Sequence, residues 1–318
     1  EYVHLDMRHL GEERILDRLE NIVHLAEDFE GVDPLEEPMP VKPGQHYAMG
    51  GVETDENGET CISGLYAAGE CACVSVHGSN RLGGNALPEL IVFGARAGRH
   101  AAGTDMGEAE ITTGRTEDTE PGQVETPVAP GAVETDDDVA ADGSGETESD
   151  GGATLADPSQ TVERAVQNER TRVERLLEKD EGIQQAEVRE HLQETMTDYV
   201  NVFRNEDGLK QALAEIREVR ERYQDVYVND PSRTFNTDLV QTIEMRNLID
   251  LAEAITLGAL ARDEFRGAHW RQEHQERKDD EWLKHTLLSW DGGDPDLWYK
   301  PVILEGEDKE YEPKERSY

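Results

Sequence analysis

One stretch of this 318-residue chain concentrates the residue types that bind small anionic molecules. Residues 64–99 place a carboxylate, Glu70, directly after Gly69, and then a glycine-rich loop that contains Arg81. A guanidinium group offers a planar fork of donors suited to a carboxylate, and glycines let the backbone approach a ligand closely. A helix that begins near Asn85 would point its first N–H groups at an anion in this loop. The pattern predicts a binding site for an anionic ligand, although spacing alone also allows an ordinary strand–turn–helix unit.

Three elements are expected to position these residues. Residues 65–70 read as a short buried strand, and residues 52–62 as a hairpin that turns at Asn57-Gly58, a strong turn signal. The helix after Asn85 has apolar residues spaced for one face, namely Leu87, Leu90, Ile91 and Phe93. Together they predict the end of a strand, a glycine loop and a helix N-terminus at one place.

The same stretch resembles the flavoprotein subunit of succinate dehydrogenase and fumarate reductase. The chain has G-L-Y-A-A-G-E-C-A-C-V-S-V-H-G-S-N-R-L-G-G-N-A-L where the family has G-L-[YF]-A-x-G-E-x-A-x-x-S-V-H-G-x-N-R-L-G-x-N-S-L. The resemblance implies bound FAD, in contact with Gly69, Glu70, Asn85, Ala86 and Leu87. Ala86 replaces the family's serine, which removes one side-chain contact to the flavin and leaves the backbone contacts.

A second motif supplies a histidine. Residues 45–51 read Q-H-Y-A-M-G-G after an extended proline-rich run, and they resemble the family's P-x-x-H-Y-x-M-G-G. By itself, a histidine before a tyrosine is more often structural. The resemblance implies that His46 binds substrate and that Arg81 is its cationic partner at the other end of a dicarboxylate.

The function implied is oxidation of succinate to fumarate, with hydride transfer to FAD and electrons passed through an iron–sulfur subunit and a membrane anchor to quinone. In the family the proton-accepting arginine lies upstream, so we expect it before Glu1, and we expect this chain to be the inactive carboxy-terminal portion of a longer subunit. Fumarate reductase and L-aspartate oxidase are alternatives within related enzymes. A non-catalytic protein that docks onto other subunits is an alternative from another class.

Composition limits the partners. The formal net charge is −40, from 71 acidic and 31 basic residues, which disfavours direct binding to nucleic acid and anionic membranes. Scarce lysine with excess acid is typical of a salt-rich cytosol, so a halophilic source is expected. No apolar run is long enough to cross a membrane. The family resemblance implies peripheral attachment, through partner subunits, at the cytoplasmic face of the cell membrane.

The expected fold is mixed, α+β with α/β character. The resemblance implies that residues 1–42, in which the apolar spacing predicts a helix from Gly11, are the tail of a capping domain, and that residues 43–103 are the carboxy-terminal part of a Rossmann-like FAD-binding domain. Residues 104–158, which are acidic and poor in large apolar residues, read as a disordered linker. Residues 159–318 predict an antiparallel helical bundle with an extended tail.

Four apolar stripes predict the helices of this bundle, the last capped by Asn236 or Thr237. Their members are Val162, Ala165, Val166, Val173, Leu176 and Leu177; Val188, Leu192, Met196, Tyr199, Val200 and Phe203; Leu209, Leu213, Ile216, Val219, Tyr223 and Val226; and Leu239, Ile243, Leu248, Ile249, Ala252, Ile255 and Leu260.

Residues 262–285 resemble the family's E-S-R-G-x-H-x-R segment. We expect Arg266, His269 and Arg271 to organise its packing against the flavin domain; a metal site at His269 and His274 lacks a third ligand at a convincing spacing. Cys71 and Cys73 are expected to be buried thiols on one side of a strand.

Overall fold

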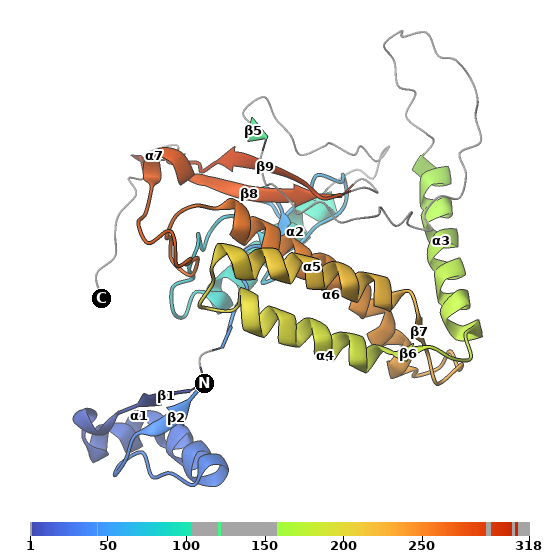
Figure 1. Cartoon of the computed structure of the whole chain (residues 1–318). Helices are drawn as coiled ribbons and strands as arrows, with labels where there is room; N and C mark the ends of the chain where they lie inside the picture. Colours follow the sequence, from blue (N-terminus) through green and yellow to red (C-terminus); the bar gives the residue numbers. More distant parts are fainter. Residues whose placement is uncertain are drawn as a thin grey trace. The chain divides into compact units, whose positions relative to one another are not determined.

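The computed structural model describes residues 2–42, 44–103, 120–121, 158–290, 294–306 and 309–310 (Figure 1). The chain divides into two compact units, Glu1–His46 and Tyr47–Tyr318. Nearly all of the expected acidic linker, residues 104–158, and the end of the tail, residues 311–318, lie outside the described residues. None of the described helices has the length and apolar character needed to span a membrane.

The first unit is a helix packed beside a two-stranded sheet. Helix α1 (Glu12–Leu25) continues into a π-helical turn (Ala26–Glu30) and stops at Gly31, whose φ of 68° is the left-handed conformation that ends many helices. Strands β1 (Val3–Leu5) and β2 (Met39–Val41) pair antiparallel. The helix predicted from Gly11 is therefore confirmed, and its core is formed by Met7, Ile15, Val23, Ala26 and Met39.

Three helices of the second unit lie side by side in alternating directions (Figure 1). They are α4 (Gln185–Thr195) with its π-helical turn (Met196–Val200), α5 (Glu206–Tyr223) and α6 (Thr237–Ala261). The side chain of Asn236 accepts a hydrogen bond from the N–H of Leu239, which confirms one of the two predicted caps. The predicted stripe on α5 is confirmed as core, since Leu209, Leu213, Ile216 and Val219 are all buried.

On α6 the predicted stripe is confirmed only in part, since Ile249, Ala252 and Leu260 are buried but other members are not. Leu248 and Ile255 are 42% and 48% exposed, whereas Thr242 and Thr256 are completely buried. Each threonine hydroxyl donates to the carbonyl four residues earlier, of Asp238 and Ala252 respectively. Because these bonds satisfy the hydroxyls, a polar residue type can occupy the core face of the helix.

Helix α3 (Pro158–Glu178) does not contribute the predicted core stripe. None of its described side chains is buried, and Val166 remains 45% exposed. The helix runs steeply across the end of the other three (Figure 1). Among the described elements, its main contacts are with α6 and β7 (Val226–Tyr227). Alanine and valine dominate its stripe, so it offers little apolar area to bury.

The carboxy-terminal part adds a small sheet. Strands β8 (Lys284–Ser289) and β9 (Asp296–Pro301) pair antiparallel, and β5 (Glu120–Pro121) joins the other edge of β9. Between α6 and β8 the chain is irregular apart from the short helix α7 (Asp279–Trp282).

Two predictions for the motif stretch are wrong. Residues 65–70 form no strand, because Gly64 and Gly69 adopt φ values of 79° and 86° and Tyr66 makes only a single bridge to Glu59. The strands are instead β3 (Val52–Glu53) and β4 (Ala72–Cys73), paired parallel, so residues 52–62 are not a hairpin. The turn itself is confirmed, since Gly58 N donates to Asp55 O at 3.0 Å.

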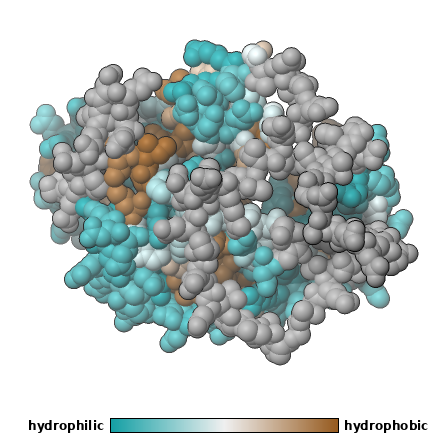
Figure 2. Space-filling model, turned by 90° about the horizontal axis from the view of Figure 1, so that it is seen from above, coloured by the Kyte–Doolittle hydropathy of each residue, from teal (hydrophilic) through white to brown (hydrophobic). Residues whose placement is uncertain are grey.

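Helix α2 (Ala86–Gly103) confirms the helix after Asn85, but its predicted apolar face is open in the described structure. Leu87 and Ile91 are 69% and 71% exposed, and only Glu89 and Ala97 are buried. Figure 2 shows areas of apolar surface between hydrophilic areas on one face of the molecule. Cys71 is exposed, so the expectation of a buried thiol is wrong there, while burial raises the pKa of the half-buried Cys73.

Candidate functional site

The loop between β4 and α2 presents Arg81 over an aromatic ring. The guanidinium carbon lies 4.5 Å from the centroid of the Tyr47 ring, a cation–π contact that fixes the charge in place. Nη1 donates to the carbonyl of Leu82 at 3.3 Å, whereas Nε is buried and has no acceptor among the described residues. A buried donor without an acceptor is costly. An anion that accepts from Arg81 would remove that cost, so the side chain fits a carboxylate ligand.

Beneath Arg81 lies a cluster that sequence reasoning missed. The hydroxyl of Tyr47 donates to Glu89 Oε2 at 3.2 Å and lies 3.4 Å from His77 Nε2. The side chain of Glu89 is 3% exposed, and its Oε2 is 3.8 Å from His77 Nε2. Removal from water, together with the charge of Glu89, raises the pKa of Tyr47, so the phenol stays protonated and remains a donor.

A signal for this cluster was present in the sequence. Glu89 stands in the first turn of a helix among apolar neighbours, Pro88, Leu90 and Ile91. A carboxylate in such a position is either exposed or held by donors. Only the fold shows that the donor is Tyr47, which comes much earlier in the chain.

The residues predicted to contact the flavin line the start of α2 and the turn before β4. Glu70 Oε1 accepts from the N–H of Ala48 at 2.9 Å. Gly69 is buried against Leu90 of α2 and adopts a φ of +86°, a backbone conformation that other residues rarely take, so the position favours glycine. The N–H groups of Ala86 and Leu87, in the first turn of α2, have no intrahelical acceptor.

The loop also leaves room for a flat ring system. A Cβ added at Gly83 or Gly84 would meet no atom within 4 Å, so both glycines border open space. Open space beside two glycines, next to a helix N-terminus, fits a planar and electron-rich cofactor. Of the two predicted substrate residues, Arg81 lies in the second unit and His46, which is exposed, ends the first; their pairing stays a prediction.

The carboxy-terminal segment contacts this loop, as predicted, but in the described structure Ala268 and His285 make the hydrogen bonds rather than the expected Arg266, His269 and Arg271. Ala268 N donates to Ser79 O at 2.9 Å, and Ser75 Oγ lies 3.0 Å from His285 Nε2. Lys300 Nζ reaches Glu53 Oε1 at 2.7 Å. Arg271 instead faces the helical bundle, where it donates to Leu260 O and Asp263.

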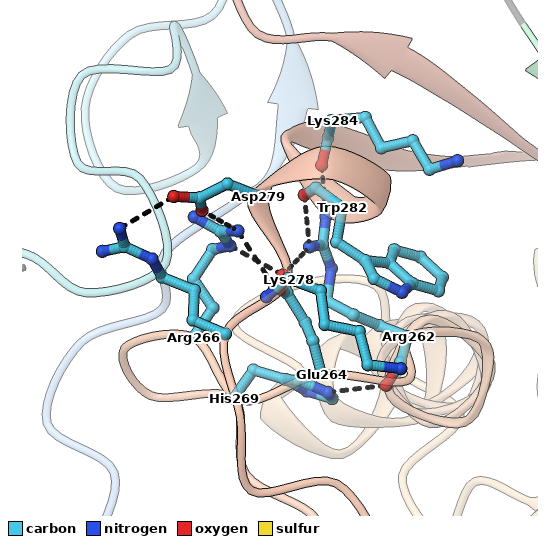
Figure 3. Close-up of polar contacts among 9 residues, drawn as sticks. Arg262, Glu264, Arg266, His269, Lys278, Asp279, Trp282 and Lys284 are labelled. Carbon is cyan, nitrogen blue, oxygen red and sulfur yellow. Dashed lines mark hydrogen bonds and ion pairs between the residues drawn. The ribbon is translucent and has the colours of Figure 1, made fainter. Parts of the chain in front are cut away.

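An ion-pair network supports the docking segment (Figure 3). Glu264, completely buried, accepts from Arg266 at 2.6 and 3.0 Å and from Lys278 N at 3.0 Å, and it is also paired with Arg262. Arg266 has a second carboxylate partner, Asp279, at 2.7 Å. Three donors to one buried carboxylate make this network a rigid base for the segment.

Comparisons with known proteins agree with this geometry. Residues 1–87 match the family described as FAD binding domain, and residues 189–318 the one described as fumarate reductase flavoprotein C-term. The fumarate reductase flavoprotein subunit of Mycobacterium tuberculosis is 38% identical, covering 99% of this chain and 47% of that protein. The succinate dehydrogenase flavoprotein subunit of Coxiella burnetii is 33% identical, covering 100% of this chain and 47% of that protein.

The chain belongs to the succinate dehydrogenase and fumarate reductase flavoprotein family. A solved quinol fumarate reductase from Escherichia coli superposes with a TM-score of 0.73 at 33% identity, over 97% of this chain and 46% of that one. The chain spans about half the length of the curated relatives it matches, 47% for the two subunits named above.

The cofactor of this flavoprotein family is FAD, and the site residues fit it. Glu70 would accept from hydroxyls of the cofactor, and the N–H groups at the start of α2 would face the flavin ring beside Gly83 and Gly84. Ala86 removes the family's serine hydroxyl, but the backbone that offers its N–H remains. The described residues contain no group of three or more potential metal ligands.

The docking segment predicts a pH dependence of folding. Burial lowers the pKa of His269 from 6.5 to about 4, so the ring stays neutral and donates from Nε2 to Arg262 O at 2.9 Å. The unfolded chain takes up this proton near pH 6.5 and the folded chain only near pH 4. Stability is therefore complete above pH 6.5 and falls as the pH drops toward 4, by about 3 kcal/mol at most.

Urea unfolding of the full chain between pH 4 and 7 checks this expectation. His269→Gln should flatten the slope, whereas the exposed His24→Gln should leave it unchanged. Burial also lowers the pKa of His285, which therefore contributes a part of the slope in the same direction. Equal slopes for wild type and His269→Gln would contradict the assignment.

Proposed function

We propose that the chain is part of the flavoprotein subunit of a succinate dehydrogenase, in which Arg81 and His46 bind the two carboxylates of succinate. The observation that carries the proposal is Arg81, whose cation is held over the Tyr47 ring with a buried Nε–H that lacks an acceptor in the described structure. A carboxylate is the acceptor that this donor fork suits best. His46 would bind the far end of the four-carbon diacid.

The chain's residues would act chiefly by binding and orientation. FAD, when bound, supplies the hydride acceptor. Arg81 would hold one carboxylate so that a C–H bond of the substrate lies against the ring plane, and its fixed charge beside that carboxylate would polarise the bond. The N–H groups that begin α2 would favour negative charge on the ring beside them. No proton acceptor is assigned within this chain.

Fumarate reductase is the second candidate, because relatives at similar identity carry both names. The same two cationic side chains would bind fumarate, since the two acids differ only in the central carbon–carbon bond. The direction is set by the redox partners. We propose an iron–sulfur subunit and a membrane anchor that exchanges electrons with quinone, with this flavoprotein peripheral at the cytoplasmic face of the membrane.

The halophilic source stays a proposal that rests on composition. A net charge of −40 leaves strong self-repulsion, which salt would screen. A folding midpoint that rises with salt concentration would support it.

The function is tested on the full-length, FAD-loaded flavoprotein with its partner subunits. We expect succinate to reduce an electron-accepting dye and malonate, an unreactive dicarboxylate, to compete. Faster oxidation of a reduced dye by fumarate would favour the reductase, and oxidation of aspartate would favour L-aspartate oxidase. A protein that holds FAD but turns over none of these acids would instead be a docking subunit.

A further inference from the structure

The loop that carries Arg81 is held in place by the far end of the chain. Ser79, two residues before Arg81, accepts from Ala268 N at 2.9 Å. Gly267 lies against the same residue so closely that a Cβ would be 2.5 Å from Ser79 Oγ and 2.8 Å from its carbonyl carbon and oxygen. Gly267 also adopts φ +59°, a conformation that other residues rarely take. The turn is therefore shaped to touch the loop backbone directly.

The turn is rigid because both of its sides are anchored. Arg266 and His269 bridge each other, with mutual backbone bonds of 3.0 Å. Arg266 donates hydrogen bonds to the carboxylates of the buried Glu264 and of Asp279. His269 is hydrogen-bonded to the carbonyl of Arg262 at the end of α6 (Figure 3). Because the turn is anchored to the end of α6, its contact with Ser79 fixes the loop relative to the helical bundle.

The Arg81 loop needs such a support. Between β4 and α2 it forms no strand or helix, and Gly78 and Gly84 adopt φ values of 59° and 84°. Such a segment has many accessible backbone conformations, and the cation over Tyr47 holds only its side chain. The hydrogen bond from Ala268 N to Ser79 O fixes the loop backbone itself, two residues before Arg81.

We propose that residues 264–269 are a positioning element for Arg81, in which Gly267 and Ala268 fix Ser79 and Glu264 and Asp279 keep the turn rigid. The inference rests on the proposed function, since it gives Arg81 the substrate carboxylate. Gly267 and Glu264 are positioning residues that act through the loop and touch neither substrate nor cofactor.

The test is malonate binding to the full-length, FAD-loaded enzyme, measured by calorimetry. Gly267→Ala should push Ser79 aside and weaken binding roughly 10- to 100-fold, as displacements of about 1 Å do in preorganised sites. FAD content should stay that of wild type. In an Arg81→Ala background, Gly267→Ala should cause no further loss, because the positioned group is gone.

Two controls separate positioning from folding. Gly31→Ala places a side chain at a similar φ of +68° where no atom lies within 4 Å, so it reports the backbone cost alone and should bind malonate as wild type does. Asp279→Asn loosens Arg266 at a partly exposed partner and should weaken binding in the same direction, which decides the matter if Gly267→Ala does not fold.

The outcomes distinguish the two levels of the account. If wild type binds malonate and the loaded Gly267→Ala or Asp279→Asn variants bind it equally well, the positioning role is wrong and the proposed function stands. An additional loss in the Arg81→Ala background would likewise overturn it, by showing a general effect. If wild type itself binds no dicarboxylate, the proposed function fails first.

Discussion

Replacing Arg81 with alanine should lower kcat/KM for succinate by about 10²- to 10³-fold in the full-length, FAD-loaded enzyme, as removal of a preorganised charged donor does elsewhere. Arg81 combines a buried Nε–H that has no acceptor among the described residues with an aromatic ring that holds its charge in place. Alanine removes both the charge and the fork of donors. Steady-state kinetics per bound flavin is the measurement.

Two variants sharpen this result. Arg81→Lys keeps the charge but loses the planar fork, so it should recover only a part of the activity. Arg96→Ala removes an exposed arginine of α2 that makes a 3.5 Å bond to Asn57 and lies 6.0 Å from the centroid of the Phe93 ring, and it should leave kinetics unchanged. Wild-type kcat/KM in loaded Arg81→Ala would remove Arg81 from the substrate site.

Replacing Arg271 with methionine should destabilise the full chain by about 3 kcal/mol. The side chain of Arg271 is 1% exposed, donates to Leu260 O in the last turn of α6 at 2.8 Å, and has the carboxylate of Asp263 at 2.8 Å. Glu206 and Glu273 lie at 3.6 and 3.7 Å. Methionine leaves a helix-terminal carbonyl without its side-chain donor, and it removes the cation shared by three carboxylates, of which Glu206 keeps Lys210 at 2.7 Å.

Urea denaturation followed by far-ultraviolet circular dichroism measures this loss. Arg233→Met is the matched control, since that side chain is 67% exposed and its ion pair is 3.7 Å long; it should cost no more than about 1 kcal/mol. If both variants unfold at the same urea concentration, Arg271 is not the structural cation that its burial indicates.

The helices of the bundle were predictable where large apolar residues at helical spacing mark the buried face. Leu209, Leu213, Ile216 and Val219 repeat at helical spacing and are all buried on α5, and Asn236 caps α6 as an asparagine at that position should. The same logic failed on α3, because periodicity shows that a helix has an apolar face but not that another element covers it.

The motif stretch was predictable in its chemistry but not in its backbone. Residues 65–70 have the composition of a buried strand, yet positive φ at Gly64 and Gly69 breaks the extended conformation. Which strands pair depends on residues far apart in the sequence, and here β4 pairs with β3 in parallel. The pairing was therefore invisible in the local pattern.

The contacts that hold Arg81 were beyond sequence reasoning for the same reason. Tyr47, Glu89 and Gly267 come from three separate places in the chain, and the local sequence around each does not say which residue it contacts. Only the fold brings the ring under the guanidinium group and the glycine turn against Ser79.

The most direct test is a structure of the full-length holoenzyme with malonate or fumarate bound. We expect the guanidinium nitrogens of Arg81 to lie about 2.7–2.9 Å from one carboxylate and His46 to contact the other, with the diacid against the flavin ring. A ligand bound in the enzyme with Arg81 still donating only to Leu82 and out of reach of either carboxylate would contradict it.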